Sequence, residues 1–294
     1  MSTVDVVVVS YNSREHLHRC VAPLRELPDV NVIVVDNASS DGTLETVADL
    51  PLTIVARPSN GGFAVGCNEG VRAGAAPYIL FLNPDATIQA ASLTRLLDVL
   101  RSDRATGAVV PRIEHPDGTL AFSLRRFPRW TSSLGEALFL HRLFPNAGWA
   151  TEIVRDPAAY EREWAPEWAS GACLLVSRQV LEQLGGFDEG FFLFGEDVDL
   201  CARLRAAGLE LRFVPDARVS HFEGASAPNT VTLPLLAGAR IRYAQKHRGP
   251  VGRVIDRGAV ALNALTHLAL GRGGLPARRG HLRALQIAFG DRGR

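Results

Sequence analysis

Two carboxylates close apolar runs of the chain, in positions where each could bind a ligand. Asp36 ends the run VNVIVVD, and Asp85 follows the run YILFL by way of Asn83 and Pro84. A carboxylate is a suitable partner for the N3–H of a pyrimidine base. Mg²⁺ or Mn²⁺ takes one or two carboxylates together with phosphate oxygens and water. These residue types could therefore hold a nucleotide and a divalent metal.

Both carboxylates also have a purely structural interpretation. Asp36 could close an Asx-turn or cap a helix, and Asn-Pro-Asp is ordinary turn chemistry. The neighbours of Asp36 in VVDNASSDGT already supply turn and cap groups, so we expect Asp36 to be free for a ligand. Asn83 is pushed toward extended geometry by the proline after it, and Pro84 cannot donate to a sheet ladder. The strand should stop there and leave Asp85 exposed at its tip.

A second group of acids begins a predicted helix, and a histidine follows a later strand. Glu196, Asp197 and Asp199 fall in the first turn of EDVDLCARLRAAG, where the macrodipole favours acids. Capping accounts for one or two of them. The third lies beside the aromatic run FFLF, as expected of a general base in a partly dry cleft. His221 follows LRFVPDARVS; a lone histidine is more often structural, and the alternative is contact with a metal or a diphosphate.

Apolar runs alternate with helical stretches in the N-terminal part of the chain. VDVVVVS (4–10), VNVIVVD (30–36), LTIVA (52–56) and YILFLN are typical of strands covered on both faces. Between them we expect a helix around 14–27, a short helix after SSDGT, and a helix in GGFAVGCNEGVRAGA with small residues for close packing. This alternation predicts an α/β protein with a Rossmann-like, mostly parallel central sheet flanked by helices.

Polar residues stand at the ends of these predicted strands. Ser10 and Tyr11 follow the first strand, Asp36 ends the second, Arg57 follows the third and Asp85 the fourth. In such sheets ligands bind beyond the carboxyl ends of the strands. We therefore expect these groups to converge on one crevice. The irregular stretch 112–168, rich in Arg, Pro and Trp, should shape a substrate cleft.

The charge of the chain is unevenly distributed. Its 294 residues are 47% hydrophobic and 21% charged, as in a folded soluble protein. The net charge of +1 hides twelve Lys and Arg against two Asp and Glu from Arg240 to Arg294, a local balance of +10 that leaves −9 for the remainder. The basic tail could meet an anionic partner, such as a membrane surface or nucleic acid, or could simply be solvated.

The tail also has an amphipathic pattern. A basic amphipathic helix can lie in a membrane interface without spanning it, or its apolar face can pack on the rest of the protein. The apolar residues that recur at near-helical spacing are Val260, Leu262, Leu265, Leu268, Leu282, Leu285, Ile287 and Phe289. No run of about 18 apolar residues occurs, so we expect no spanning helix.

Other features point to the cytoplasm. A strand is expected from residue 4, which leaves no room for a signal peptide. The four cysteines form no CxxC pair and should be reduced packing residues. We therefore expect a cytoplasmic protein, with peripheral contact at the inner face of the cell membrane.

Seven motifs follow one another along the chain: VVSYN, VVDNASSDGT, NGGFAVGCNEG, LFLNPDA, SGACLLVSR, GGFDEGFFLFGEDVDLCARLRAAG and VSHFEGAS. In this order they resemble the family 2 glycosyltransferases with the GT-A fold, and most of all their bacterial rhamnosyltransferase branch. The resemblance covers roughly residues 3–245. It implies a GT-A catalytic domain over 1–235, with nucleotide-sugar binding over about 1–110 and the acceptor side and catalytic base over about 111–235. A basic helical extension would follow over 236–294.

The resemblance implies inverting transfer of a sugar from a dTDP- or UDP-sugar, with dTDP-rhamnose as the first choice, to a glycan or lipid-linked acceptor. Asp197 would be the general base, Glu196 would orient the acceptor, and Trp168 would lie on the acceptor side. Asp85 would hold Mg²⁺ or Mn²⁺, and His221 would reach the metal or the diphosphate. The residues implied for donor binding are Ser10, Tyr11, Asp36, Arg57, Asn60, Asn83 and Asp85.

One residue departs from the family pattern, and three other classes of protein compete. Asn83 stands where the DxD motif has its first Asp, which implies weaker metal binding. A dinucleotide-dependent oxidoreductase would need G-x-G-x-x-G after the first strand, and SYNSREH has no glycine. A nucleotidyltransferase would need a Gly-rich basic loop there. A catalytically inactive sugar-binding module on the same fold is disfavoured by the intact Asp85, Asp197 and His221. The basic tail has no recognisable nucleic-acid module.

Overall fold

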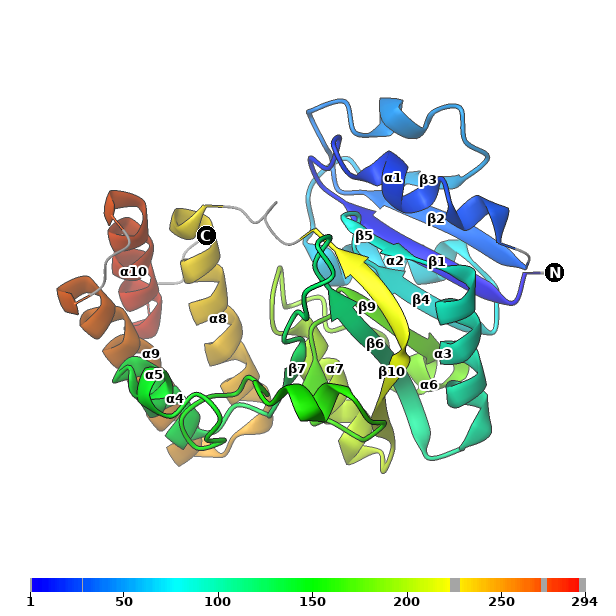
Figure 1. Cartoon of the computed structure of the whole chain (residues 1–294). Helices are drawn as coiled ribbons and strands as arrows, with labels where there is room; N and C mark the ends of the chain where they lie inside the picture. The colour runs from blue at the N-terminus through cyan, green and yellow to red at the C-terminus, as the bar shows by residue number, and fades with distance from the viewer. Residues whose placement is uncertain (1, 28, 223–227, 271–273, 291–294) are drawn as a thin grey trace. The chain divides into compact units, whose positions relative to one another are not determined.

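The computed structural model describes residues 2–27, 29–222, 228–270 and 274–290, and the chain divides into two compact units (Figure 1). Unit 1 comprises Met1–Leu124, Pro157–Gly190 and Glu196–Ala225. Unit 2 comprises Arg125–Asp156, Phe191–Gly195 and Ser226–Arg294. The tail that follows residue 236 thus shares a unit with a segment from the middle of the chain.

Unit 1 is built on an eight-stranded sheet. Its strands, in spatial order, are β3 (Thr53–Ala56), β2 (Val30–Asp36), β1 (Val4–Ser10), β4 (Tyr78–Leu82), β9 (Cys173–Ser177), β6 (Thr106–Glu114), β10 (Glu210–His221) and β5 (Ala86–Ile88). Neighbours pair in parallel except that β9 runs against β4 and β6, and β5 runs against β10. The prediction of a mostly parallel sheet is confirmed. Two further short strands, β7 (Leu124–Arg125) and β8 (Trp168–Ala169), form a separate pair.

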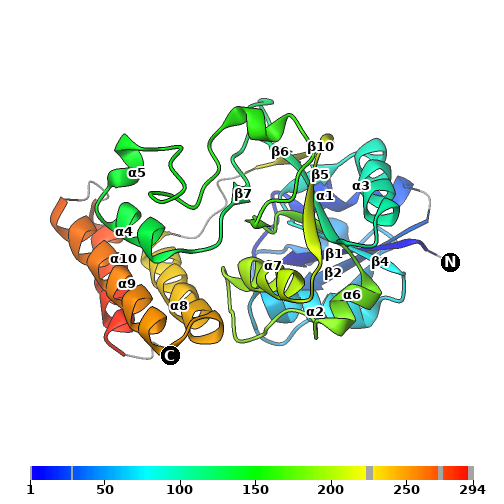
Figure 2. The same cartoon turned by 90° about the horizontal axis from the view of Figure 1, so that it is seen from below.

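Helices cover both faces of this sheet (Figure 2). They are α1 (Leu17–Val21), α2 (Phe63–Ala73), α3 (Ala90–Ser102), α6 (Arg178–Gln183) and α7 (Glu196–Ala206). Alternate residues of β1 serve opposite faces: Val4, Val6 and Val8 join one cluster with side chains of α1 and α3. On the other face, a Cβ at Gly66 or Gly70 of α2 would collide with Val9 or Val7. The expected close packing of the small residues of α2 on the sheet is confirmed.

Three local predictions differ from the structure. The helix expected around 14–27 is split into α1 and the 3₁₀ helix Leu24–Glu26, because Pro23 has no N–H for continued helical bonding. Strand β5 was not predicted, since three residues are too short for a periodic signal. Strand β10 runs on to His221 through a register shift between Val214 and Arg218, the span that contains Pro215.

Unit 2 is helical. Its helices are α4 (Trp130–Ala137), α5 (Leu140–Leu143), α8 (Asn229–His247), α9 (Pro250–Leu270) and α10 (Gly274–Ala288). Helix α10 packs on α8 and α9, and α4 packs on α9 (Figure 2). A Cβ at Gly280 would fall on the carbonyl oxygen of Asn229, so α10 crosses α8 at backbone contact. Within the described ranges, no helix has the length and apolar character needed to cross a bilayer.

The amphipathic pattern of the tail is divided between core and surface. Val260 is buried in a cluster with small residues of α8, α9 and α10, and Leu285 and Ile287 pack against that cluster. Leu265, Leu282 and Phe289 are exposed. Part of the apolar face that was predicted to lie in a membrane interface therefore forms the core of unit 2.

Candidate active site

The carboxyl ends of β1 and β2 are joined through Ser10 and Asp36. The two residues pair across the strands, and Ser10 Oγ donates to Asp36 Oδ1 at 3.0 Å. Asp36 also accepts hydrogen bonds from the backbone N–H and the hydroxyl of Ser39. The expectation that neighbouring residues would leave Asp36 free was therefore wrong, because Asp36 itself accepts hydrogen bonds from Ser39 in the loop after β2. Of its two oxygens, Oδ2 accepts one of these bonds and Oδ1 accepts two.

The loops after β1 and β2 hold each other in place. Asn12, which has a left-handed backbone conformation (φ 51°), donates its N–H to Ser39 Oγ and accepts from Ser40 N–H, both at 2.9 Å. Ser13 N–H donates to Thr43 Oγ1 at 2.8 Å. Tyr11 stands on this braced turn with its side chain exposed. A flat base could stack on such a ring without any rearrangement of the loops.

Arg57 contacts the middle of α2, and Asn60 contacts the residue just before that helix. The Arg57 guanidinium forms an ion pair with Glu69 of α2, and its Nε donates to Ser59 O at 3.3 Å. Asn60 Oδ1 accepts from Gly62 N–H at 2.9 Å, just before the helix begins. Both predicted donor-binding residues thus lie beside the β3 end of the sheet, with local partners that fix their positions.

The residues predicted to hold a metal are brought together. His221 Nε2 lies 3.0 Å from Asp85 Oδ1 and 3.4 Å from the amide nitrogen of Asn83. The backbone explains this: Ala86 of β5 pairs with His221 of β10, and Phe222 N–H donates to Asp85 O. The expected exposure of Asp85 was wrong, since its side chain is only 14% exposed against the histidine.

These three side chains could bind a divalent cation that takes its other ligands from a bound diphosphate. A carboxylate, an imidazole and an amide can supply oxygen and nitrogen donors, and a diphosphate would complete the shell of Mg²⁺ or Mn²⁺. Over the described ranges, no three His, Cys, Asp or Glu side chains gather in a way that could hold a metal by themselves.

The acids at the start of α7 have three different environments. Asp199 is fully buried and accepts from Arg203 Nε at 2.8 Å, so it has a structural role. Glu196 is also buried, and its charge helps burial to raise the pKa of the Cys67 thiol in α2. Asp197 alone among these acids is partly exposed. This arrangement favours Asp197 over Glu196 as the group that meets a substrate.

A short backbone segment links Asp197 to the metal-binding candidates. Asp197 Oδ2 accepts from Gly171 N–H at 3.3 Å. The carbonyl of the following residue, Ala172, accepts from Asn83 N–H at 2.9 Å. The segment continues into β9, which pairs with β4. Trp168, predicted on the acceptor side, is half-buried on β8 just before it. Gly171 and Ala172 lie in the motif SGACLLVSR, which shows a buried strand and gives no hint of this bridging position.

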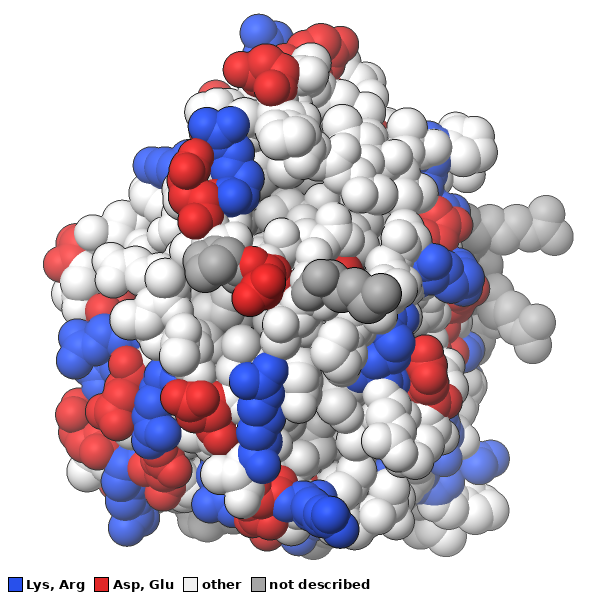
Figure 3. All heavy atoms as spheres, turned by 90° about the vertical axis from the view of Figure 1, so that its right-hand side faces the viewer, with Lys and Arg blue, Asp and Glu red and all other residues white. Residues whose placement is uncertain are grey.

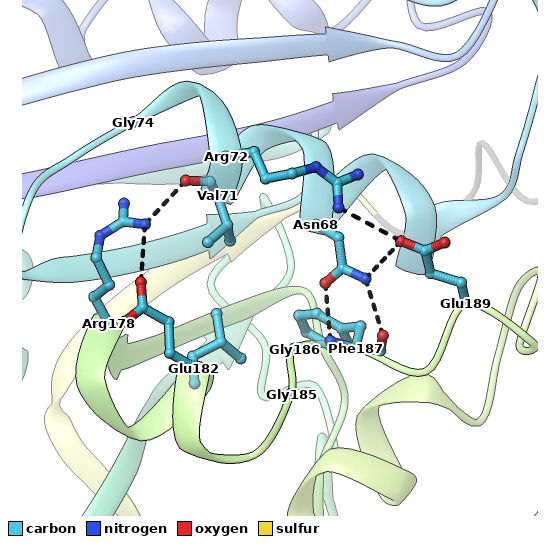
Figure 4. Close-up of a pocket in the computed structure, with 11 residues that line it drawn as sticks. Asn68, Val71, Arg72, Gly74, Arg178, Glu182, Gly185, Gly186, Phe187 and Glu189 are labelled. Carbon is cyan, nitrogen blue, oxygen red and sulfur yellow. Dashed lines mark hydrogen bonds and ion pairs between the residues drawn. The ribbon is translucent and has the colours of Figure 1, made fainter.

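Asn68 is a positioning residue that the sequence reasoning missed (Figure 4). Its amide donates to Phe187 O and accepts from Phe187 N–H, both at 2.9 Å, and also donates to Glu189 at 3.0 Å. Gly186 has φ 75°, and a Cβ there would meet Asn68 Oδ1. The Phe187 ring stands edge-on to Phe81 of β4 at 4.9 Å. Asn68 thus ties the segment that leads toward α7 onto α2 and the sheet.

A pocket of about 700 Å³ lies beside this contact and apart from the candidate residues (Figure 4). It is lined by the second half of α2, by α6 and by the turn at Gly185 and Gly186. Arg178 at its edge is engaged with Asp5 at 2.8 Å and with Val71 O at 2.9 Å. None of the predicted site residues lines this pocket. We therefore do not assign the catalytic site to this pocket.

Comparisons with known proteins identify the family of this chain. The family model "Glycosyl transferase family 2" matches residues 5–184, which contain the strand ends, the Asn83-Asp85 motif and the Gly171 segment. This protein belongs to glycosyl transferase family 2. A second model, "N-terminal domain of galactosyltransferase", matches residues 156–225 of this family 2 enzyme, the part that carries Asp197 and His221.

The relatives of this family 2 enzyme include rhamnosyltransferases. It is 33% identical to the N-acetylglucosaminyl-diphospho-decaprenol L-rhamnosyltransferase of Mycobacterium tuberculosis (strain ATCC 25618 / H37Rv), over 98% of both chains. It is 30% identical to Rhamnosyltransferase WbbL of Escherichia coli (strain K12), over 49% of this chain and 52% of that protein.

A solved structure supports the fold. The mannosyltransferase PcManGT from Pyrobaculum calidifontis, solved in complex with GDP-Man and Mn²⁺, matches with a TM-score of 0.57 at 19% identity. The match covers 98% of this chain and 80% of that one. The predicted GT-A fold and the assignment as a glycosyltransferase that resembles bacterial rhamnosyltransferases are confirmed.

Proposed function

We propose that this glycosyltransferase moves L-rhamnose from dTDP-rhamnose, with inversion, to a hydroxyl group of a lipid-linked glycan in cell-wall or polysaccharide synthesis. The observation that carries the proposal is the backbone link that joins Asp197, through Gly171 and Ala172, to Asn83. It ties a candidate base for the acceptor to a candidate site for the donor diphosphate. The near full-length similarity to a rhamnosyltransferase with a diphospho-decaprenol substrate supports the choice of sugar and acceptor.

The donor side is assigned to the ends of β1, β2 and β4. Asp36 Oδ2 accepts one hydrogen bond from the described residues, so one of its lone pairs remains for the N3–H of a base. Thymidine and uridine share that group. Ser10 orients the carboxylate, Tyr11 offers its ring to the base, and Arg57 and Asn60 border the same edge of the sheet.

The diphosphate is assigned to Asn83, Asp85 and His221. When bound there, a divalent cation would neutralise charge that develops on the leaving diphosphate. The protein residues hold their own side chains in place: the Asp85–His221 contact orients both side chains before the donor binds. Such preorganisation avoids the cost of ordering these groups during the reaction.

The acceptor is assigned to Asp197. Its carboxylate would take the proton of the attacking hydroxyl, a contribution typically worth about 10²–10⁴-fold in rate. The N–H of Gly171 fixes Oδ2. Glu196, which is buried, would help to orient the acceptor from within the protein, and Trp168 would border the acceptor from β8.

A donor panel tests the proposal. The purified protein is incubated with Mg²⁺ or Mn²⁺, a lipid-diphosphate-linked acceptor and dTDP-rhamnose, UDP-sugars or GDP-mannose, and nucleotide release and product anomeric configuration are measured. We expect the fastest release with dTDP-rhamnose and an inverted product. Donor binding by thermal shift without any transfer would favour an inactive nucleotide-sugar-binding module instead. Faster transfer from another sugar would reject the choice of rhamnose.

Peripheral contact with an anionic membrane belongs to the same proposal. A lipid-linked acceptor is held at a bilayer, so a cytoplasmic enzyme would have to meet it at the inner face of the cell membrane. The basic tail, with a balance of +10 from Arg240 to Arg294, supports such a contact.

A further inference from the structure

Positive charge and exposed apolar side chains are concentrated in the same unit. Unit 2 carries seventeen Lys and Arg against five Asp and Glu, a formal balance of +12 in a chain with a net charge of +1. Of the exposed large apolar side chains in the described ranges, all but Tyr11 and Ile54 belong to unit 2. The face of unit 1 in Figure 3 instead shows acidic and basic side chains interspersed.

The segment of α4 and α5, residues 130–143, which we call the hairpin, contacts the C-terminal end of α9. Thr266 Oγ1 of α9 donates to the carbonyl oxygen of Ala137 at 2.7 Å. The Phe139 ring lies 4.4 Å from the His267 ring, which in turn lies 5.0 Å from the His281 ring of α10. Residues 137–139, the last turns of α9 and part of α10 therefore form one contiguous region.

Large apolar side chains are exposed in this region, at residue 138, on α5 and directly after it, and at the end of α9 and the start of α10. We call them the apolar corner: Leu138, Leu143, Phe144, Leu270 and Leu275. Leu143 is 73% exposed, Leu270 72% and Leu275 70%. Leu138 and Phe144 are each about half exposed. An apolar group of this kind, left in water, is a common mark of an interaction surface.

The surroundings of the apolar corner indicate what covers it. Arg142 is exposed in the hairpin with its guanidinium 4.5 Å from the Phe139 ring centre, and Arg278, Arg279 and Arg283 are exposed on α10. Trp149 is exposed and its ring lies 5.3 Å from that of Phe144. Leucine, aromatic rings and arginine together are the composition of an interfacial membrane anchor.

We propose that the apolar corner inserts into the interface of an anionic bilayer, while these arginines contact lipid phosphates. The hairpin, which the sequence pattern assigned to a substrate cleft, is then a second membrane contact beside the tail. The inference rests on the proposed function for its purpose, since a lipid-linked acceptor is held at a bilayer. The contact itself needs neither donor nor acceptor.

Vesicle co-sedimentation of the full chain, without any nucleotide sugar, tests the inference. The vesicles are phosphatidylcholine alone or with phosphatidylglycerol. The corner variant is Leu143→Ser, Phe144→Ser and Leu275→Ser together. The matched control is Val251→Ser with Val254→Ser, at the other end of α9, where each side chain is 73% exposed. These exposed positions should tolerate serine, which is checked by circular dichroism and thermal melting.

We expect the wild type to bind the anionic vesicles, less at high salt, and to bind phosphatidylcholine weakly. The corner variant should lose at least about 10-fold in partitioning, and the control should stay within about twofold. Failure of the wild type to bind, or equal loss in both variants, overturns the assignment. Self-association of the wild type that the corner variant abolishes, without vesicle binding, would identify a second copy as the occupant. Because no transfer is measured, a negative donor panel leaves this result unaffected.

Discussion

His221 Nε2 lies 3.0 Å from Asp85 Oδ1, although 136 positions separate the two residues in the chain. The contact arises because β5, directly after Asp85, pairs in antiparallel fashion with the end of β10. A strand of three residues thus decides which histidine reaches the candidate metal site.

Asp85→Ala should weaken metal-dependent binding of the nucleotide diphosphate and leave the fold intact. The substitution removes the carboxylate of the donor set, whereas Asn83 and His221 alone are poor ligands for a hard cation. Calorimetry with dTDP, with and without Mn²⁺, measures the effect, and we expect a loss of at least about 10-fold in the Mn²⁺ dependence. Asp216→Ala, at an exposed position of β10, is the control. An unchanged Mn²⁺ effect in Asp85→Ala would return Asn83-Pro84-Asp85 to the role of a turn.

Asp197→Asn should fold and bind donor but lose transfer by at least about 10²-fold, since an amide cannot accept the proton of the acceptor hydroxyl. Its single oxygen can keep only one of the two bonds that the carboxylate accepts, from Gly171 N–H and from Val198 N–H, so the fold of the variant is checked by thermal melting. Single-turnover transfer and donor affinity are measured together.

Asp199→Asn is the contrasting variant. Asp199 is buried against Arg203, so its replacement should lower the melting temperature by weakening a charge-assisted hydrogen bond worth about 1.5–3 kcal/mol. Transfer by the folded fraction should stay near normal. The reverse pattern in the two variants would exchange the catalytic and structural assignments.

Asn68→Ser should reduce kcat more than it changes donor affinity. A serine cannot make the paired hydrogen bonds to Phe187, so the segment that leads toward α7 and Asp197 should be less well placed, and small displacements cost about 10²-fold. Steady-state kinetics and hydrogen exchange at 187–190 are measured. Glu182→Gln, in the same pocket but outside this contact, is the control. Lower stability with unchanged kcat would mean that Asn68 only supports the fold.

The contribution of Glu136 to the stability of unit 2 should fall as pH rises from about 5 to 8. Burial and the nearby Glu152 raise the pKa of Glu136 from 4.5 to about 7. The folded state therefore holds this proton more tightly than the unfolded state. The resulting stabilisation is complete below pH 4.5 and is lost as pH rises through 7.

Thermal melts between pH 5 and 8 measure this effect. In Glu136→Gln the side chain is neutral at every pH. The melting temperature of this variant should therefore rise relative to that of the wild type as pH rises. Arg240, which pairs with both Glu136 and Glu152, stays charged throughout. Parallel pH profiles for the two proteins would contradict the prediction.

The predictions that held from sequence concern strands and their ends. The runs at β1, β2 and β4 are continuous and β-branched, and burial of such runs depends on residue type and spacing, which are local properties. The buried, unpaired cysteines and the small-residue face of α2 follow for the same reason. Because parallel strands share one carboxyl edge, the neighbourhood of Ser10 and Asp36 could also be predicted.

The partners of individual side chains could not be predicted in this way. Asp36 accepts from Ser39, Glu196 is buried near Cys67, and Asp197 accepts from the N–H of Gly171. Each of these outcomes depends on which surface a helix or turn presents after packing. Acids in the first turn of a helix look equivalent in the sequence, and only burial separates them.

The sequence by itself determined the family, the α/β class, the order of the first four strands, and the set of residues from which the site is drawn, since these follow from motifs and from short-range periodicity. Tertiary structure decided that His221 meets Asp85, that residues 125–156 join the tail helices in one unit, and which apolar residues of the tail remain exposed. These outcomes depend on strand pairing and helix packing between segments far apart in the chain. The side chains of such segments become neighbours only when burial of the whole apolar surface selects one arrangement.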